Sequence, residues 1–452
     1  MAFSFNPREL SDFARYYGFH YDNWDPIALM RDVLLDMERG LRGQSSSLPM
    51  IPAHISPVSH VPAGKTVLAL DAGGTNLRAS LVHFDESGRA LAEGTVKAPM
   101  PGTRGRAGAE AFFDEIAALA LPLLEKQRRV AGIGFTFSYP MEITEDAEGI
   151  LLAFSKEVDA PGVIGKAVGA GLREALGRRG FRYDGRIVML NDTAATLLSG
   201  LAEIPRDGEA VRTKDAYGSA GGPVVGLILG TGFNTAYPEK NIPKIGFESP
   251  ANPQIVVCET GTFALRYRGP LDREYDSTTR NPGAYTLEKA AAGAYLGPLT
   301  LHILKQAVKD QVICLKKAGE LLAMPALQTR DLNEFMHAPL AAEGPLGGLF
   351  GLDERDALAA AQYLAGIVTE RAGLLAAAVV AAAVERIDAP PEPFAPVRIA
   401  VEGTTYLMYK GMRRALESWL HIMLVSGKPR PYVVSPVEQA SLFGAAVAAL
   451  SV

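Results

Sequence analysis

Four apolar segments of this chain each run directly into a turn of small residues, and this pattern restricts the folds that the chain can adopt. Three of them read as strand, glycine-rich turn and strand, and the fourth reads as a strand that enters a turn. In order, they cover residues 66–85, 224–240, 255–267 and 397–407. Helical patterns separate them, at residues 107–128, 162–176, 286–318 and 358–387. The repetition predicts an α/β protein with a duplicated architecture.

The segments outside this pattern are a first helix and two irregular stretches. Asp25 is expected to cap a helix that begins at Pro26, because apolar residues then recur at helical spacing as far as Leu41. The Ser- and Pro-rich residues 43–65 predict an extended, irregular connection to the next folded unit. The polar, Gly-rich residues 206–222 predict a mobile surface loop, to which we assign no function.

The composition of the 452 residues disfavours several classes of protein. The net charge is -5 and there is no basic block, so nucleic acid is not expected as a partner. Two cysteines are too few for a disulfide framework or a zinc ribbon, which fits a reducing, cytoplasmic location. The N-terminus shows no signal-peptide pattern. The longest apolar run, residues 372–384, is shorter than the ~20 residues of a membrane span, so we expect a buried Ala-rich helix and no membrane partner.

The first candidate site is the turn after the first predicted strand, with Asp71, Gly73, Gly74, Thr75 and Asn76. Two glycines let the backbone approach a ligand, and successive N–H groups in such a turn bind anions. A carboxylate at the end of the strand can hold Mg²⁺ directly or through water. An ordinary hairpin turn explains the same residues equally well.

A second turn, Gly230-Thr231-Gly232, repeats the logic of the first. Two such turns that face each other would grip a polyphosphate from both sides, and a pair arises by chance far more rarely than a single turn. The Walker pattern GxxxxGK[ST] is absent from the sequence, which disfavours a P-loop NTPase.

Asn191 and Asp192 follow an apolar strand pattern and precede a helical one. Such residues are good helix N-caps, and from the residues alone we favour that interpretation. The functional alternative makes Asp192 a general base at the carboxyl end of a strand, where α/β sheets place ligands. The other polar candidates, each explained more simply as a turn, surface or helix residue, are Ser138, Ser155, Lys156, Asn234, Glu259 and Glu288. A sugar site needs this inventory, because carboxylates and amides form paired hydrogen bonds with vicinal hydroxyls.

Taken in order, these segments resemble the hexokinase family, within the actin-like ATPase superfamily, from about Ser45 to the C-terminus. LALDAGGTNLRASLV and LGTGFNTAY resemble its two phosphate motifs, and VEGTTY resembles its adenosine motif. GFTFSYP resembles its sugar loop, EGILLAFSKEVDAPGVIGK its segment with a Thr-Lys pair, and NDTAAT its catalytic-base motif. NPGAYTLEKAAAGAYLG resembles the segment with a sugar-binding glutamate, and SLFGAAVAAL the closing helix. The number and order of these motifs make the resemblance highly specific.

The resemblance implies a role for each matching residue. Asp192 matches the general base, and Lys156 is expected to assist by holding the sugar. The implied sugar contacts are Ser138, Ser155, Lys156, Asn191, Asp192, Asn234, Glu259 and Glu288. The implied nucleotide positions are Asp71, Gly73, Gly74, Thr75, Asn76, Arg78, Gly230, Thr231, Gly232, Gly403 and Thr404, with Asp71 holding Mg²⁺ through water. Several positions depart from the family pattern. Ser155 replaces a Thr and Glu402 replaces an Asp, Val257 and Thr260 differ from the residues usual around Glu259, and the final motif, EQASLFG, lacks the family's extra glycines.

The resemblance also implies a fold and an activity. The fold is the two-lobed actin-like ATPase (ribonuclease H-like) fold, with duplicated lobes around a central cleft. The small lobe would hold residues 63–190 and 435–452, and the large lobe residues 1–62 and 191–434. The activity is transfer of the γ-phosphoryl group of Mg·ATP to the 6-hydroxyl of a hexose, most of all glucose. ATP and Mg²⁺ are therefore the expected cofactors, and the oligomeric state stays open.

Three alternatives stay open. A catalytically silent sugar sensor on the same fold would bind hexose without forming ADP, because a fold does not fix a function. An actin- or chaperone-like ATPase would turn over ATP without sugar, and it gives no reason for the residues on the sugar side. Within the kinase class, a preference for mannose or fructose is also compatible with the sequence.

Overall fold

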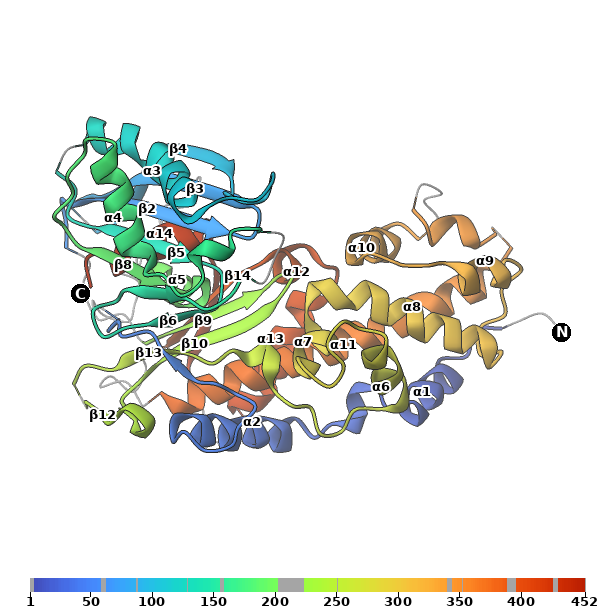
Figure 1. The fold of residues 1–452 in the computed structure, drawn as a ribbon. Coiled ribbons are helices and arrows are strands. Elements are labelled where there is room, and N and C mark those ends of the chain that lie inside the picture. Colours follow the sequence, from blue (N-terminus) through green and yellow to red (C-terminus); the bar gives the residue numbers. More distant parts are fainter. Residues whose placement is uncertain are drawn as a thin grey trace.

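The computed structural model describes residues 4–57, 62–86, 88–127, 129–154, 158–201, 223–249, 251–339, 344–351, 353–387, 396–425 and 430–451. Two mixed sheets, each with its own helices, form two lobes (Figure 1). The predicted site residues Ser155 and Lys156 and the predicted loop at 206–222 lie outside the described residues.

The smaller lobe is built on a five-stranded sheet in the order β4-β3-β2-β5-β8. Its strands are β2 (Thr66–Gly73), β3 (Asn76–Phe84), β4 (Ala90–Pro99), β5 (Ile133–Phe137) and β8 (Ile187–Leu190). β3 is antiparallel to β2 and β4, whereas β2, β5 and β8 run parallel to one another. Helices α3 (Ala109–Lys126) and α4 (Val168–Arg178) pack their apolar side chains on this sheet. β6 (Met141–Ile143) and β7 (Gly149–Leu151) form a separate small hairpin.

The larger lobe is built on a six-stranded sheet in the order β1-β13-β10-β9-β14-β15. Its strands are β1 (Ile51–Pro52), β9 (Val224–Leu229), β10 (Phe233–Glu239), β13 (Gln254–Val257), β14 (Val397–Glu402) and β15 (Tyr432–Pro436). β14 pairs in parallel with β9 and β15, and the other pairs are antiparallel. A short hairpin of β11 (Asn241–Ile242) and β12 (Phe247–Glu248) lies outside this sheet.

The long helix α11 (Arg355–Arg386) forms the centre of the larger lobe, and α2 (Pro26–Leu41) and α13 (Met412–Val425) pack against it (Figure 1). The apolar run at 372–384 is buried as predicted. By length and composition alone, helix α11 could cross a membrane, but 94% of its most apolar window is buried inside the protein. The prediction for Asp25 is also confirmed, because its carboxylate accepts a hydrogen bond of 2.8 Å from the Ala28 N–H. The remaining helices are α1 (Pro7–Tyr16), α6 (Pro270–Ser277), α7 (Thr286–Ala291), α8 (Gly293–Lys309), α9 (Ala318–Ala323), α10 (Thr329–His337) and α12 (Thr404–Met408).

Two helices join the lobes. α5 (Asp192–Ser199) packs on β9 and β10 of the larger sheet, and α14 (Ala440–Ala448) packs on β2 and β5 of the smaller one. The two helices also contact each other, so their side chains share one core with both sheets. They cross very closely at Gly444, where a Cβ atom would lie 1.9 Å from the carbonyl oxygen of Ala195. This close packing fixes the N-terminus of α5, which begins with Asp192, at the junction of the lobes.

The structure corrects three predictions of local structure. The second half of the strand–turn–strand at 255–267 is wrong, because Glu259 has a left-handed backbone with φ of 57° and a 3-10 turn follows at Thr260–Thr262. The single helix at 286–318 is two helices, α7 and α8, separated by an extended Ala292. Finally, the irregular stretch at 43–65 includes the short strand β1, and helix α1 precedes the helix that we predicted as the first.

Candidate active site

The first glycine turn connects β2 to β3, and its tip faces solvent. Gly73 and Asn76 are cross-strand partners, so Gly74 and Thr75 form the turn between them. The side chain of Tyr139 donates a hydrogen bond of 2.5 Å to the carbonyl of Gly74, and this anchors the turn to the segment that follows β5. Sequence reasoning did not identify that anchor. Thr75 and Asn76 are exposed, which leaves their polar groups accessible to a ligand.

Asp71 lies at the inner end of this hairpin and is almost fully buried, with 2% of its surface exposed. Arg78 is its cross-strand partner, and its Nε donates a hydrogen bond of 2.8 Å to the Asp71 carboxylate. The predicted nucleotide residues Asp71 and Arg78 are therefore an ion pair. Ser138, predicted as a sugar contact, follows β5 next to this strand, and its N–H donates to the Ala72 carbonyl at 3.0 Å.

The second glycine turn connects β9 to β10 and is anchored by two other segments. The Gly230 carbonyl accepts hydrogen bonds from the Gly293 N–H and the Thr405 hydroxyl, both at 2.8 Å. The Thr231 carbonyl accepts a third, of 3.0 Å, from the Ala294 N–H. The Thr231 side chain is exposed and Gly232 is partly buried. The backbone carbonyls of the turn are therefore fixed by hydrogen bonds from α8 and α12, and the side chain of Thr231 remains accessible.

Gly403 and Thr404 lie beside this second turn, because β14 runs parallel to β9. Gly403 has φ of 125°, and a Cβ atom there would lie 2.3 Å from the Leu229 carbonyl oxygen. Only glycine fits that backbone in that space. Helix α12 then begins at Thr404, which is exposed. The second glycine turn and the predicted adenosine motif are therefore in direct contact.

Three of the predicted sugar-binding residues form a connected group. The Asn234 amide nitrogen donates a hydrogen bond of 2.8 Å to the Glu259 carboxylate. The Asn234 amide oxygen accepts from the backbone N–H groups of Thr235 and Thr260, at 2.8 and 3.3 Å. The Glu288 carboxylate accepts a hydrogen bond of 3.3 Å from the Phe233 N–H. These contacts hold an amide and two carboxylates directly behind the second glycine turn.

Asn191 and Asp192 form the N-terminus of α5. The Asn191 side chain accepts a hydrogen bond of 2.8 Å from the Thr193 N–H, so its interpretation as an N-cap is confirmed. Asp192 is the first residue of the helix, and among the described residues its carboxylate accepts one long hydrogen bond, of 3.3 Å, from the Thr193 hydroxyl. The cap and a catalytic carboxylate are therefore adjacent residues, and the two interpretations do not exclude each other.

Several carboxylates at this junction have pKa values above their usual range. Burial, together with the negative charges of Asp192 and Glu288, raises the pKa of Glu259 from 4.5 to about 7, although the hydrogen bond from Asn234 opposes the shift. Burial also raises the pKa of Glu288. Burial and the charges of Asp192 and Asp71 raise the pKa of Glu402 to about 7. The charge of Asp192 therefore acts on both Glu259 and Glu402.

Glu402 is the functional candidate that sequence reasoning missed. It ends β14 directly before Gly403, and the sequence signal for it was its place in the adenosine motif. Its electrostatic partners Asp71 and Asp192 belong to the phosphate and catalytic motifs. The Glu402 carboxylate therefore lies close enough to both motifs to be affected by the charge of each.

The acidic residues suit Mg²⁺ held mainly by phosphates and water. Asp71, Asp192 and Glu402 supply oxygen donors, which this ion prefers, and Mg²⁺ in nucleotide sites commonly uses one or two carboxylates and several waters. Within the described part of the chain, no group of three or more His, Cys, Asp or Glu side chains is arranged to hold an ion by itself. The side chains thus fit an ion that arrives with a polyphosphate better than a permanent protein-bound one.

The raised pKa of Glu259 predicts a pH-dependent stability. Between about pH 4.5 and about 7 the folded protein keeps a proton that the unfolded chain has released, so the free energy of unfolding should fall as pH rises. Each unit of pKa difference corresponds to about 1.4 kcal/mol, which limits the effect to about 3 kcal/mol. Denaturant unfolding between pH 5 and 8 measures it. Glu259→Gln should lose this share of the slope, whereas Glu320→Gln, at an exposed residue of α9, should keep it. Equal slopes in wild type and Glu259→Gln would contradict the assignment.

Comparison with known proteins identifies relatives for both halves of the chain. Two models of the hexokinase family match residues 16–202 and 224–451. Hexokinase-1 of rice (Oryza sativa subsp. japonica) is 30% identical, over 92% of this chain and 85% of its own length. Hexokinase-3 of mouse (Mus musculus) is 29% identical over 84% of this chain, which spans only 41% of the mouse protein.

A solved structure extends the comparison to the whole fold. The hexokinase from Schistosoma mansoni, complexed with glucose, superposes with a TM-score of 0.75 at 22% identity. The superposition covers 99% of this chain and 100% of that one. It confirms the predicted two-lobed actin-like ATPase fold.

Proposed function

We propose that this chain, which belongs to the hexokinase family, transfers the γ-phosphoryl group of ATP to the 6-hydroxyl of a hexose, with glucose as the preferred substrate. The observation that carries the proposal is the place of Asp192. Its charge acts on Glu259, which belongs to the group of predicted sugar-binding residues Asn234, Glu259 and Glu288. It also acts on Glu402, which lies beside the second glycine turn. A carboxylate between two such groups is where a hydroxyl and a phosphoryl group would meet.

In this mechanism Asp192 accepts the proton of the sugar 6-hydroxyl. The oxygen attacks the γ-phosphorus in line, a new P–O bond forms, and the bond to the bridging oxygen breaks to release ADP. Asn234, Glu259 and Glu288 orient the sugar through hydrogen bonds to its hydroxyls, because their hydrogen bonds within the protein hold them in fixed positions. Ser138, Ser155 and Lys156 are the proposed contacts from the other lobe.

On the phosphate side, the chain offers two glycine turns and the turn at Gly403. The backbone N–H groups and the hydroxyls of Thr75, Thr231 and Thr404 bind phosphate oxygens as charge develops on them. Asp71 is the residue that would hold Mg²⁺ through water, and the ion would supply positive charge to the phosphates of ATP. The ion pair with Arg78 fixes Asp71 in place.

A coupled assay of ADP formation tests the function. With saturating ATP and Mg²⁺, we expect ADP to appear only when a hexose is present. The kcat should be about 1–100 s⁻¹, the range typical of kinases. A panel of glucose, mannose, fructose and 2-deoxyglucose ranks the substrates by kcat/KM. Sugar binding without ADP would instead identify a silent sensor, and ADP formation without sugar would identify an ATPase. Either result would overturn the proposal.

A further inference from the structure

A buried ion pair lies next to Glu288, one of the predicted sugar-binding residues. Asp276, at the end of α6, is 6% exposed, and Lys289, in α7, is 5% exposed. The Lys289 ammonium donates a hydrogen bond of 2.5 Å to the Asp276 carboxylate. Burial alone would raise the pKa of Asp276, but hydrogen bonds from Lys289 and Arg268 lower it, so the Asp276 carboxylate is ionised. None of the roles proposed above uses this pair.

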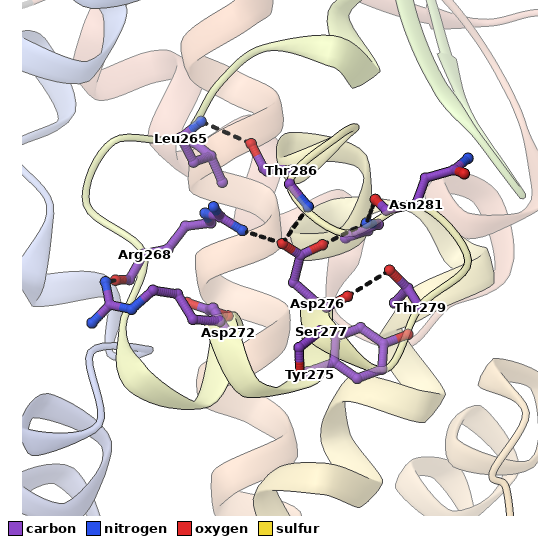
Figure 2. Close-up of polar contacts among 12 residues, drawn as sticks. Leu265, Arg268, Asp272, Tyr275, Asp276, Ser277, Thr279, Asn281 and Thr286 are labelled. Atoms are coloured by element: carbon purple, nitrogen blue, oxygen red, sulfur yellow. Dashed lines mark hydrogen bonds and ion pairs between the residues drawn. The ribbon is translucent and has the colours of Figure 1, made fainter.

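The pair ties three segments together (Figure 2). Figure 2 shows the Arg268 guanidinium directed at the Asp276 carboxylate, and their hydrogen bond is 2.7 Å long. The same carboxylate accepts a hydrogen bond of 2.8 Å from the Gly283 N–H. The Lys289 ammonium also donates to the Asn281 carbonyl, at 2.6 Å. The end of α6, the loop at 281–285 and helix α7 therefore converge on two side chains.

Helix α7 needs such support. It has six residues, and isolated helices of that length are unstable in water. The residue before it, Tyr285, has a left-handed backbone with φ of 54°, which costs free energy for a side chain other than glycine. A second anchor lies at its start, where the Thr286 hydroxyl accepts a hydrogen bond of 2.9 Å from the Leu265 N–H (Figure 2). The same hydroxyl donates a hydrogen bond of 2.9 Å to the Phe263 carbonyl. The position of α7 therefore comes from its contacts and not from the helix itself.

The position of α7 matters because Glu288 directly precedes Lys289. The Glu288 carboxylate accepts the Phe233 N–H, next to the second glycine turn. At the other end of α7, the N–H groups of Gly293 and Ala294 bond the carbonyls of that turn. A shift of α7 would therefore move a sugar carboxylate first and the phosphate turn second.

We propose that Asp276 and Lys289 are positioning residues for hexose binding, which hold α7 so that the Glu288 carboxylate faces the sugar. This inference rests on the proposed function. The energetics favour a role beyond stability, because the cost of removing two charges from water often cancels their attraction, and apolar residues of similar volume stabilise as well or better. The pair fixes geometry that an apolar contact would leave free to shift.

The test is hexose affinity without nucleotide, measured by isothermal titration of glucose into the full-length protein. Lys289→Met should raise the Kd for glucose at least about tenfold, which corresponds to about 1.4 kcal/mol, since a displaced Glu288 carboxylate would lose its hydrogen bonds to the sugar. Lys289→Arg should recover part of the affinity. Arg386→Met removes the cation from another ion pair of the same lobe, with Glu239 at 2.7 Å, and should leave the Kd unchanged at a similar loss of Tm. Equal effects of Lys289→Met and Arg386→Met on the Kd would overturn the inference.

A double-mutant cycle separates positioning from general damage. If Lys289 acts through Glu288, Lys289→Met should raise the Kd for glucose less than threefold when it is made in the Glu288→Gln variant. Independent, multiplicative effects would overturn the inference. If Lys289→Met does not fold, the nearly isosteric Asp276→Asn takes its place in the same cycle. Wild type that neither binds glucose nor forms ADP would overturn the proposed function itself, whereas normal wild-type binding with an unchanged Kd in both variants would overturn only the positioning role.

Discussion

Replacing Asp192 with alanine should lower kcat for hexose phosphorylation at least about 100-fold, the low end of the effect of losing a general base. Asp192 begins α5 at the junction of the lobes, and among the described residues its carboxylate accepts a long hydrogen bond, of 3.3 Å, from the Thr193 hydroxyl. The close packing of α5 on α14 at Gly444 does not involve the carboxylate, so the helix should stay in place. Steady-state kinetics with glucose and ATP measure the change.

Two further measurements separate catalysis from folding in the Asp192 variants. Asp192→Asn keeps the shape and polarity but not the basicity, so its kcat should fall as far as that of Asp192→Ala. The charge of Asp192 opposes ionisation of Glu259 and Glu402. Because Asp192→Asn removes this repulsion, its Tm at pH 8 should not fall below that of the wild type. Near-normal turnover in either variant would remove Asp192 from the role of general base.

Replacing Gly403 with alanine should raise the KM for ATP tenfold or more. With φ of 125° and the Leu229 carbonyl oxygen 2.3 Å from the new Cβ atom, the backbone at 403 must move. A backbone forced out of its allowed region costs about 1–3 kcal/mol, and about 1.4 kcal/mol corresponds to a tenfold change in affinity. Because the Thr405 hydroxyl bonds the Gly230 carbonyl, the displacement would reach the second glycine turn.

The sugar side provides the internal control for Gly403→Ala. The Kd for glucose should change less than threefold, since Asn234 and Glu259 are held by hydrogen bonds with each other and with the Thr260 N–H, and α7, which carries Glu288, is anchored through Lys289 and Thr286. Gly180→Ala, at a glycine with φ of 81° and open space around it, should leave both constants unchanged. An unchanged KM for ATP in Gly403→Ala would show that this turn does not bind the nucleotide.

Features with a local chemical signal could be predicted from the sequence. The turns around Gly74 and Thr231 follow apolar strands, and Asn191 has the side chain of an N-cap. The order of the motifs then predicted the fold, which the structural comparison confirms. The roles of Ser155 and Lys156 remain predictions, because they lie outside the described residues.

Features that depend on contacts between distant segments could not be predicted. Glu259 reads as part of a strand, but a left-handed backbone ends the strand there and turns its carboxylate to Asn234. Glu402 is 331 positions after Asp71, and only the fold brings their charges together. Lys289 reads as an ordinary helix residue, because nothing in its neighbourhood in the sequence reveals that Asp276 lies within hydrogen-bonding distance.

A crystal structure with glucose, Mg²⁺ and a non-hydrolysable ATP analogue tests the central claim most directly. The mechanism predicts an Asp192 carboxylate oxygen about 2.6–3.2 Å from the sugar O6, the distance expected for a general base. It also predicts that the turns at Gly74 and Thr231 contact the phosphates from opposite sides. A bound sugar whose O6 points away from Asp192, or phosphates that contact neither turn, would contradict it.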